Sequence, residues 1–251
     1  SMSRLLHQFP ISHYCEKVRW AMDYKGLDYE VKNLLPGFHL RTTKKMAPKS
    51  YLPILIDSKL KTAEQGSQQI QNSHVILNYL DETYPEKSLT PKDPELLQQA
   101  LEWEKYCDVE IGVHVRCYCY HHLLSHPKIV VPLLTQGGSW LSSLLFKLSF
   151  SKIEKIMRKT MRINEESAIQ SEAHIQQAID KLYQAYQKNE FLVGNQFSRA
   201  DLAAASLLAP LIMPAGYGLD WPETVPETLQ NFVDKNEEKL ARIRQLYQQY
   251  R

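Results

Sequence analysis

The chain has 251 residues, of which 43% are hydrophobic and 23% charged, so it can form one large or two small globular domains with a sizeable core. Its net charge of +2 gives no special affinity for polyanions, and we expect no nucleic-acid partner. The four cysteines lack the spacing of metal ligands or of a disulfide framework, so we expect reduced thiols, no metal site and a cytoplasmic protein. No charged-then-apolar leader begins the chain, so we expect no export.

The first predicted elements meet at Ser12. A short apolar strand covers residues 4–9, and an amphipathic helix follows from Ser12 to Gly26. Unpaired backbone N–H groups and the helix dipole favour an anion at such a helix N-terminus. Two roles compete for the Ser12 hydroxyl. It can cap the helix by accepting a hydrogen bond from the amide of Tyr14 or Cys15, or it can donate a hydrogen bond to a bound thiolate.

The next segments complete a βαβ unit and add a third strand. Residues 29–33 alternate between apolar and charged side chains and predict a second strand, reached by a right-handed crossover. Residues 34–49 are polar and basic, which predicts a loop with room for one helical turn. Residues 52–57 predict the third strand, and residues 59–69 predict either a longer loop or an altered fourth strand.

Helices are expected after this region. Asn72 and Ser73 open a helix that Pro85 closes, and the proline-rich residues up to Pro94 predict a linker. One long helix is predicted over residues 95–122, and its aromatic side chains are more typical of a core or an interface than of ligand contacts.

A second capped helix is expected near the C-terminus. Ser198 has Asp201 three residues further on, so the two side chains can cap the helix reciprocally. We assign this pair to stability and not to catalysis. The alanines at 203–205 allow close packing, which predicts that this helix is central to its domain.

Residues 127–163 are apolar but interrupted by glycines, serines and lysines, so they do not predict a membrane span. Their C-terminal part predicts a basic amphipathic helix. Two interpretations remain open for this segment. Residues 139–163 can contact a membrane surface, or they can form a buried helix pair that shapes a closed substrate pocket, which is the interpretation we favour.

Three ordered segments carry a resemblance to a known family. Ser12-His-Tyr-Cys15, followed by Lys-Val-Arg-Trp-Ala, resembles the first βα unit of the glutathione transferase superfamily. The segment 47–55 resembles that family's Asn-Pro-x-Gly-x-Val-Pro segment, whose last proline is cis, and residues 191–202 resemble its Ser/Thr-x-x-Asp capping motif. Together the segments span residues 4 to about 215.

The resemblance implies an α/β plus all-α protein. It predicts a thioredoxin-like, glutathione-binding domain with a mixed four-stranded sheet over residues 1–85, a linker at 86–94, and a substrate-binding helical bundle over 95–251. It also implies a homodimer with the active site near its interface.

The resemblance further implies a glutathione transferase that activates the thiol at Ser12 for attack on a hydrophobic electrophile or an organic peroxide. The glutathione-binding residues implied are His39, Leu52, Pro53, Asn72 and Ser73, and those of the substrate pocket are Tyr14, Tyr106 and Arg116. If the Leu52–Pro53 bond is cis, the backbone of Leu52 is free to pair with a cysteinyl peptide.

Two alternatives stay open. Family members that reduce thiols have cysteine where Ser12 stands, so a glutathione-dependent reductase would have to work from Cys15 alone. The unusual segments at 59–69 and 127–163, together with Asn72, leave open a non-catalytic glutathione- or ligand-binding protein of the same fold.

Overall fold

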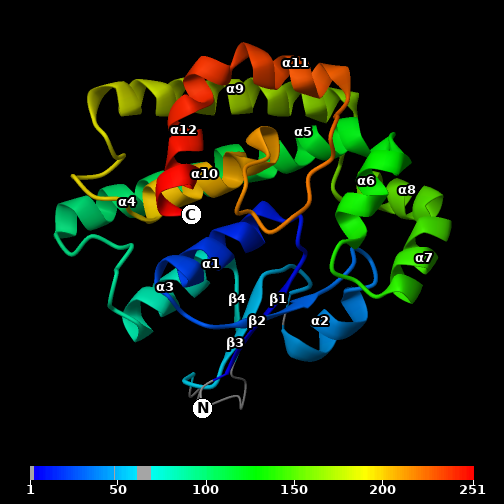
Figure 1. Ribbon diagram of the computed structural model, residues 1–251, viewed down its shortest axis with the longest axis horizontal. Coiled ribbons are helices and arrows are strands. Elements are labelled where there is room, and N and C mark those ends of the chain that lie inside the picture. The colour runs from blue at the N-terminus through cyan, green and yellow to red at the C-terminus, as the bar shows by residue number, and fades with distance from the viewer. Residues whose placement is uncertain (1–2, 48, 61–68) are drawn as a thin grey trace.

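A computed structural model describes residues 3–47, 49–60 and 69–251. Its N-terminal part holds one mixed sheet of four strands in the order β2-β1-β3-β4 (Figure 1). The strands are β1 (Arg4–Gln8), β2 (Glu30–Asn33), β3 (Ile54–Asp57) and β4 (Gln69–Gln71). β1 runs parallel to β2 and antiparallel to β3, with Leu6 opposite Val31 and Leu55. The predicted mixed four-stranded sheet is confirmed.

Three helices accompany the sheet: α1 (His13–Tyr24), α2 (Leu40–Met46) and α3 (Ser73–Thr83). α1 and α3 pack against each other, because Val18 and Met22 of α1 and Ile76 and Leu80 of α3 are all buried in one core. The apolar periodicity of α1 therefore faces the sheet and α3. The region 34–49 contains the seven-residue helix α2, more structure than the single turn we expected. The prediction for residues 59–69 falls mostly on 61–68, outside the described residues.

The rest of the chain is helical, as predicted. Its elements are α4 (Pro94–Tyr106), a π-helical segment η1 (Cys107–Gly112), α5 (Val113–Leu124), α6 (Pro127–Thr135), α7 (Trp140–Leu148), α8 (Phe150–Thr160), α9 (Glu165–Lys188), α10 (Arg199–Ile212), α11 (Glu227–Lys235) and α12 (Glu237–Tyr250). α10 lies at the centre and packs on α1, α4 and α12 (Figure 1). The predicted capping box at its start is confirmed, since Ser198 N–H donates to Asp201 Oδ2 at 3.1 Å.

The predicted helix over 95–122 differs from the structure in one respect. A π-helical stretch, η1, separates α4 from α5 without breaking the helical path. π-helical turns are rare in proteins overall, and those that occur are often found at functional sites. Here the wider turn lies opposite the start of α1, where two side chains of α1 reach its carbonyl groups.

The expected buried helix pair at 139–163 is wrong for one of its two helices. α8 turns Phe150, Ile153 and Met157 into the core. In α7 only Phe146 is buried, and the other apolar side chains face outward. No helix in the described part of the chain is both long and apolar enough to cross a membrane.

Candidate functional site

Ser12 occupies the position that the sequence predicts. It is the N-cap of α1, and its hydroxyl oxygen accepts a hydrogen bond from the amide of Cys15 at 3.3 Å. The side chain is half-buried and lines a cavity of about 470 Å³. The two roles considered for this hydroxyl use different atoms, because the oxygen accepts the capping bond while a hydroxyl can donate its O–H proton at the same time. Capping and thiol activation are therefore compatible.

Buried polar contacts hold the turn that presents Ser12. Arg19 of α1 donates to the Gln8 side chain at 2.5 Å and to the Tyr217 carbonyl at 3.0 Å. Tyr217 in turn donates its hydroxyl to the carbonyl of Ile11 at 2.5 Å. Because Arg19 and Tyr217 are buried, these bonds form away from bulk water and fix the backbone just before Ser12.

The next two side chains attach the start of α1 to η1. His13 Nε2 lies 2.6 Å from the carbonyl of Gly112, and the Tyr14 hydroxyl donates to the carbonyl of Asp108 at 2.6 Å. Burial lowers the pKa of His13 to about 3, so its ring is neutral and donates from Nε2. A methyl group on Gly112 would lie 2.2 Å from the Tyr14 hydroxyl, so the contact requires glycine. Tyr14 lines the cavity, but its hydroxyl is already engaged.

One wall of the cavity comes from the N-terminal domain. It includes Ser12, Tyr14, His39 and Leu52. The Leu52–Pro53 bond is cis, as predicted, and the Leu52 backbone has no hydrogen-bond partner among the described residues. The Gly37 amide donates to His39 Nδ1 at 3.0 Å, so Nδ1 is the acceptor and Nε2–H is the one donor of that neutral ring.

The other wall comes from the helical domain and is mainly apolar. Its side chains belong to α5, α6, α8 and its C-cap, α10 and the segment after α10, and they include Val115, Leu123, Leu133, Ile153, Ile156, Met157, Met161, Pro210, Met213 and Trp221. A cavity between two domains with a few polar groups on one wall is typical of a small-molecule site.

Arg116 is the cation of this second wall. It lines the cavity and forms no ion pair within the described part of the chain. Burial raises the pKa of Tyr120 to about 12, and the charge of Arg116 opposes that rise. Arg116 is exposed, and a guanidinium at the edge of a mainly apolar lining favours an anionic ligand nearby.

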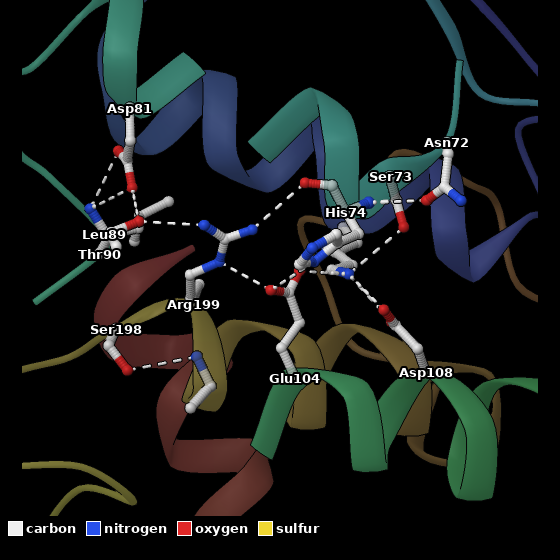
Figure 2. A network of polar contacts seen from close by, with 12 residues as sticks. Asn72, Ser73, His74, Asp81, Leu89, Thr90, Glu104, Asp108, Ser198 and Arg199 are labelled. Carbon is white, nitrogen blue, oxygen red and sulfur yellow. Dashed lines mark hydrogen bonds and ion pairs between the residues drawn. The ribbon is translucent and has the colours of Figure 1, made fainter. Parts of the chain in front are cut away.

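A buried polar network lies between α1, α3, α4, η1 and α10 (Figure 2). At its centre Lys17 Nζ contacts Glu104 Oε2 at 2.7 Å, Asp108 Oδ1 at 2.9 Å and Ser73 Oγ at 3.3 Å. Arg199 pairs with the same glutamate through Oε1 at 2.7 Å.

The charges of this network stabilise one another. Burial alone would raise the pKa of Glu104, but Lys17, His74 and Arg199 together lower it to about 2. Burial would likewise lower the pKa of Lys17, but its two carboxylate partners raise it. Asp108 shares the Lys17 ammonium with Glu104. For Asp108 the effect of burial is larger than the effect of Lys17, so the pKa of its carboxyl is raised.

Four of the predicted site residues do not line the cavity: Pro53, Asn72, Ser73 and Tyr106. The side chain of Asn72 caps α3 by accepting from the His74 amide, at a φ of 89° that asparagine tolerates better than most residues. Ser73 is buried against Lys17. Tyr106 packs edge-on against Trp103, away from the cavity. Their predicted contacts with a ligand are not tested by this geometry.

The thiol alternative has little support from the position of Cys15. The side chain is fully buried, and burial raises its pKa even though Ser12 and Arg19 oppose that rise. A thiol in that state is a poor nucleophile, because the thiolate is the reactive form.

Metal-capable side chains gather at two places in the described residues. Glu104, Asp108 and His74 form one group, whose two carboxylates already share the Lys17 ammonium. In the other, the rings of His114 and His174 stack in parallel at 4.1 Å beside Glu110. The Nδ1 atoms of both rings have partners here, since His114 Nδ1 lies 3.0 Å from Ser171 Oγ and His174 Nδ1 lies 2.7 Å from Glu110 Oε2.

The sequence analysis missed Lys17, Glu104 and Asp108. Each lies in a predicted helix, where a charged residue normally indicates a solvated face. Lys17 does fall on the apolar side of α1, one residue before Val18, and that position was the available signal. The partners lie about ninety residues away in the chain, so local patterns do not reveal them.

Comparisons with known proteins agree with this architecture. Residues 6–88 match a family model described as glutathione S-transferase, N-terminal domain. Glutathione S-transferase Z1 of Arabidopsis thaliana is 31% identical over 157 residues, which cover 61% of this chain and 64% of that protein. The chain matches less than two thirds of the length of such curated relatives.

Solved structures show the same fold over almost the whole chain. A glutathione S-transferase from Rhodospirillum rubrum F11 superimposes with a TM-score of 0.64 at 19% identity, covering 97% of this chain and 86% of that one. A glutathione S-transferase from Methylobacterium radiotolerans, in complex with glutathione sulfonate, gives a TM-score of 0.58 at 20% identity, with 94% and 90% covered.

Proposed function

We propose that this chain, a member of the glutathione transferase superfamily, binds glutathione in the cavity between its domains and activates the thiol through Ser12. The observation that carries the proposal is the position of the Ser12 hydroxyl, which caps the start of α1 and lines a cavity of about 470 Å³.

The chemistry needs only a lower thiol pKa. A free cysteinyl thiol has a pKa of about 8.5, so only a few per cent is thiolate at neutral pH. A hydrogen bond from Ser12 and the N-terminal amides of α1 both favour the anion, and together they can lower that pKa by about one to two units. The thiol proton leaves to solvent. The thiolate sulfur then forms a bond to an electrophilic carbon, whose leaving group departs with the bonding electron pair.

The remaining parts of the ligand have candidate partners in the cavity. The Leu52 backbone offers an amide and a carbonyl that have no partners among the described residues, which suits antiparallel pairing with the middle of a tripeptide. Arg116 and His39 can meet its carboxylates. Ser73 does not line the cavity, but we keep it as a further candidate, because its O–H proton can donate while its oxygen accepts from Lys17.

The apolar wall from α5 and α8 supports a hydrophobic electrophile or an organic peroxide as the second substrate. We further propose a homodimer and a cytoplasmic location, on the resemblance of the N-terminal domain to the family and on the four free thiols. No resident metal enters this mechanism.

The test is an ultraviolet titration of glutathione bound to the wild-type protein and to Ser12→Ala. We expect the wild type to lower the thiol pKa and the variant to leave it near 8.5. Turnover on a panel of electrophiles should fall in the variant by about tenfold to a hundredfold, as a loss of one to two pKa units implies.

A second variant separates capping from activation. Ser139 caps α7 by accepting from the Ser142 amide at 3.2 Å, which resembles the bond at Ser12, and it does not line the cavity. Ser139→Ala should therefore lose a cap, worth about 1 kcal/mol, without changing the thiol pKa. If Ser12→Ala binds glutathione with the wild-type thiol pKa, Ser12 is only a cap. If the wild type binds glutathione but turns over no electrophile, the chain is a binding protein.

A further inference from the structure

Helix α7 presents an unusual apolar face to the outside. Trp140 is 79% exposed and Leu148 is 74% exposed, and Leu141, Leu144 and Leu145 are each about half exposed. These side chains recur at i, i+1, i+4, i+5 and i+8, which is one face of a helix. Phe146, the buried residue of α7, lies on the opposite face. A contiguous apolar surface of this kind indicates an interaction site.

Basic side chains are frequent in the segment that carries that surface. Residues 139–163 contain six lysines and arginines and one glutamate, a net charge of +5, whereas the whole chain carries +2. The remaining residues therefore carry −3. In this segment Arg158 pairs with Glu154 at 3.0 Å, and the other five cations form no ion pair with described residues. We use the name α7–α8 face for three groups of side chains together: the exposed apolar side chains of α7, the side chain of Ile156, and these cations.

We propose that the α7–α8 face binds the surface of an anionic lipid bilayer. The proposed occupant follows from the pairing of the two features. Leucines and a tryptophan insert at the boundary between headgroups and acyl chains, while lysines above them meet lipid phosphates and carboxylates. α7 and α8 are short and lie at the periphery of the molecule (Figure 1), so they can lie in the plane of a membrane.

A second copy of the chain fits this face less well. A two-fold interface would place the same patch on both sides, so +5 would face +5 across an apolar contact. Like charges brought together in this way oppose association. The same positive charge that disfavours contact with a second copy of the chain favours contact with an anionic surface.

The α7–α8 face also adjoins the cavity. Ile156 is 54% exposed and lines the cavity at the same time, and Met157 and Met161 of the same region line it too. A protein bound through this face would receive apolar electrophiles directly from the lipid phase. This consequence rests on the proposed transferase function, whereas the binding to lipid does not.

The experiment is flotation of the full chain with vesicles of phosphatidylcholine containing 30% phosphatidylserine, compared with pure phosphatidylcholine. We expect binding to the anionic vesicles that weakens as salt rises. Lys152→Gln with Lys155→Gln should weaken it by roughly 25-fold, at about fivefold for each basic residue. Trp140→Ser with Leu148→Ser should weaken it by at least about tenfold, because binding scales with the apolar area inserted.

A matched control uses an exposed isoleucine elsewhere. Ile169 on α9 is 64% exposed, and Ile169→Ser should bind like the wild type. All substituted side chains are exposed, and circular dichroism checks that each variant is folded. Absence of binding to anionic vesicles, or equal binding by Trp140→Ser with Leu148→Ser, overturns the proposal. A third result would also overturn it: the wild type binds no vesicles, and sedimentation shows that the wild type is a dimer whereas Trp140→Ser with Leu148→Ser is a monomer. The face would then be the interface with a second copy of the chain.

Discussion

Replacement of Glu104 by glutamine tests how much the buried network contributes to stability. In the wild type the pKa of this carboxyl is lowered from 4.5 to about 2, because Lys17, His74 and Arg199 outweigh the effect of burial. At ~1.4 kcal/mol for each pKa unit, the difference corresponds to about 3 kcal/mol. Glu104→Gln should lower the free energy of unfolding at pH 7 by at least about that amount, since it leaves buried cations short of a carboxylate.

The pH dependence has a definite sign. A carboxyl whose folded pKa is depressed contributes its full stability above the unfolded pKa, near 4.5, and loses it as the pH falls toward 2. Between pH 7 and pH 3 the wild type should lose about 2 kcal/mol of this contribution, whereas Glu104→Gln has no carboxyl to titrate. The gap between the two unfolding free energies should therefore narrow by about 2 kcal/mol at pH 3.

Urea unfolding at both pH values measures this gap, with Glu102→Gln as the control. Glu102 lies on the same helix but is exposed and accepts one hydrogen bond, from Gln98 at 2.9 Å. Its substitution should change stability by less than about 0.5 kcal/mol. If the gap between wild type and Glu104→Gln is the same at pH 7 and pH 3, the charged form of Glu104 is not stabilised by its partners and the electrostatic account of the network is refuted.

Three further outcomes are expected from the region around α1. Gly112→Ala should lower the free energy of unfolding by about 1–3 kcal/mol in urea, because its methyl group would displace the Tyr14 ring; an unchanged stability would contradict this contact. His13, whose pKa burial lowers to about 3, should stay neutral at pH 5 in nitrogen NMR spectra, and a protonated ring there would contradict its burial. A thiol reagent should label the half-buried Cys117 in the native protein and leave the buried Cys15 unmodified until unfolding; rapid labelling of Cys15 would revive the reductase alternative.

The features that the sequence predicts correctly are local ones. The Ser12 cap and the capping box at Ser198 are each determined by a few neighbouring residues, whereas the cis bond before Pro53 was expected from the family resemblance. The strands and helices also follow from apolar periodicity, which is a property of single segments. Local signals alone do not bring Ser12 and Leu52 together. The family resemblance supplied the order of the elements, and with it the expectation that both residues belong to one site.

Contacts between distant helices were beyond this kind of reasoning. The ion pairs of Lys17 depend on how α1 meets α4, and a lysine in an amphipathic helix is usually solvated. The outward face of α7 was also mispredicted. An apolar helix face predicts burial, but whether another element is present to cover it is a property of the whole fold.

The π-helical segment shows why the cavity and the network belong together. The Asp108 side chain pairs with Lys17, while the Asp108 carbonyl accepts from the Tyr14 hydroxyl. At the other end of the segment the Gly112 carbonyl binds His13. The segment η1 thus contacts the first turns of α1 at His13, Tyr14 and Lys17, through both its side chains and its backbone. These bonds are buried or half-buried and all involve one short segment, so a shift of η1 would move the start of α1 with it. The position of the Ser12 hydroxyl in the cavity therefore depends on the interface between the two domains.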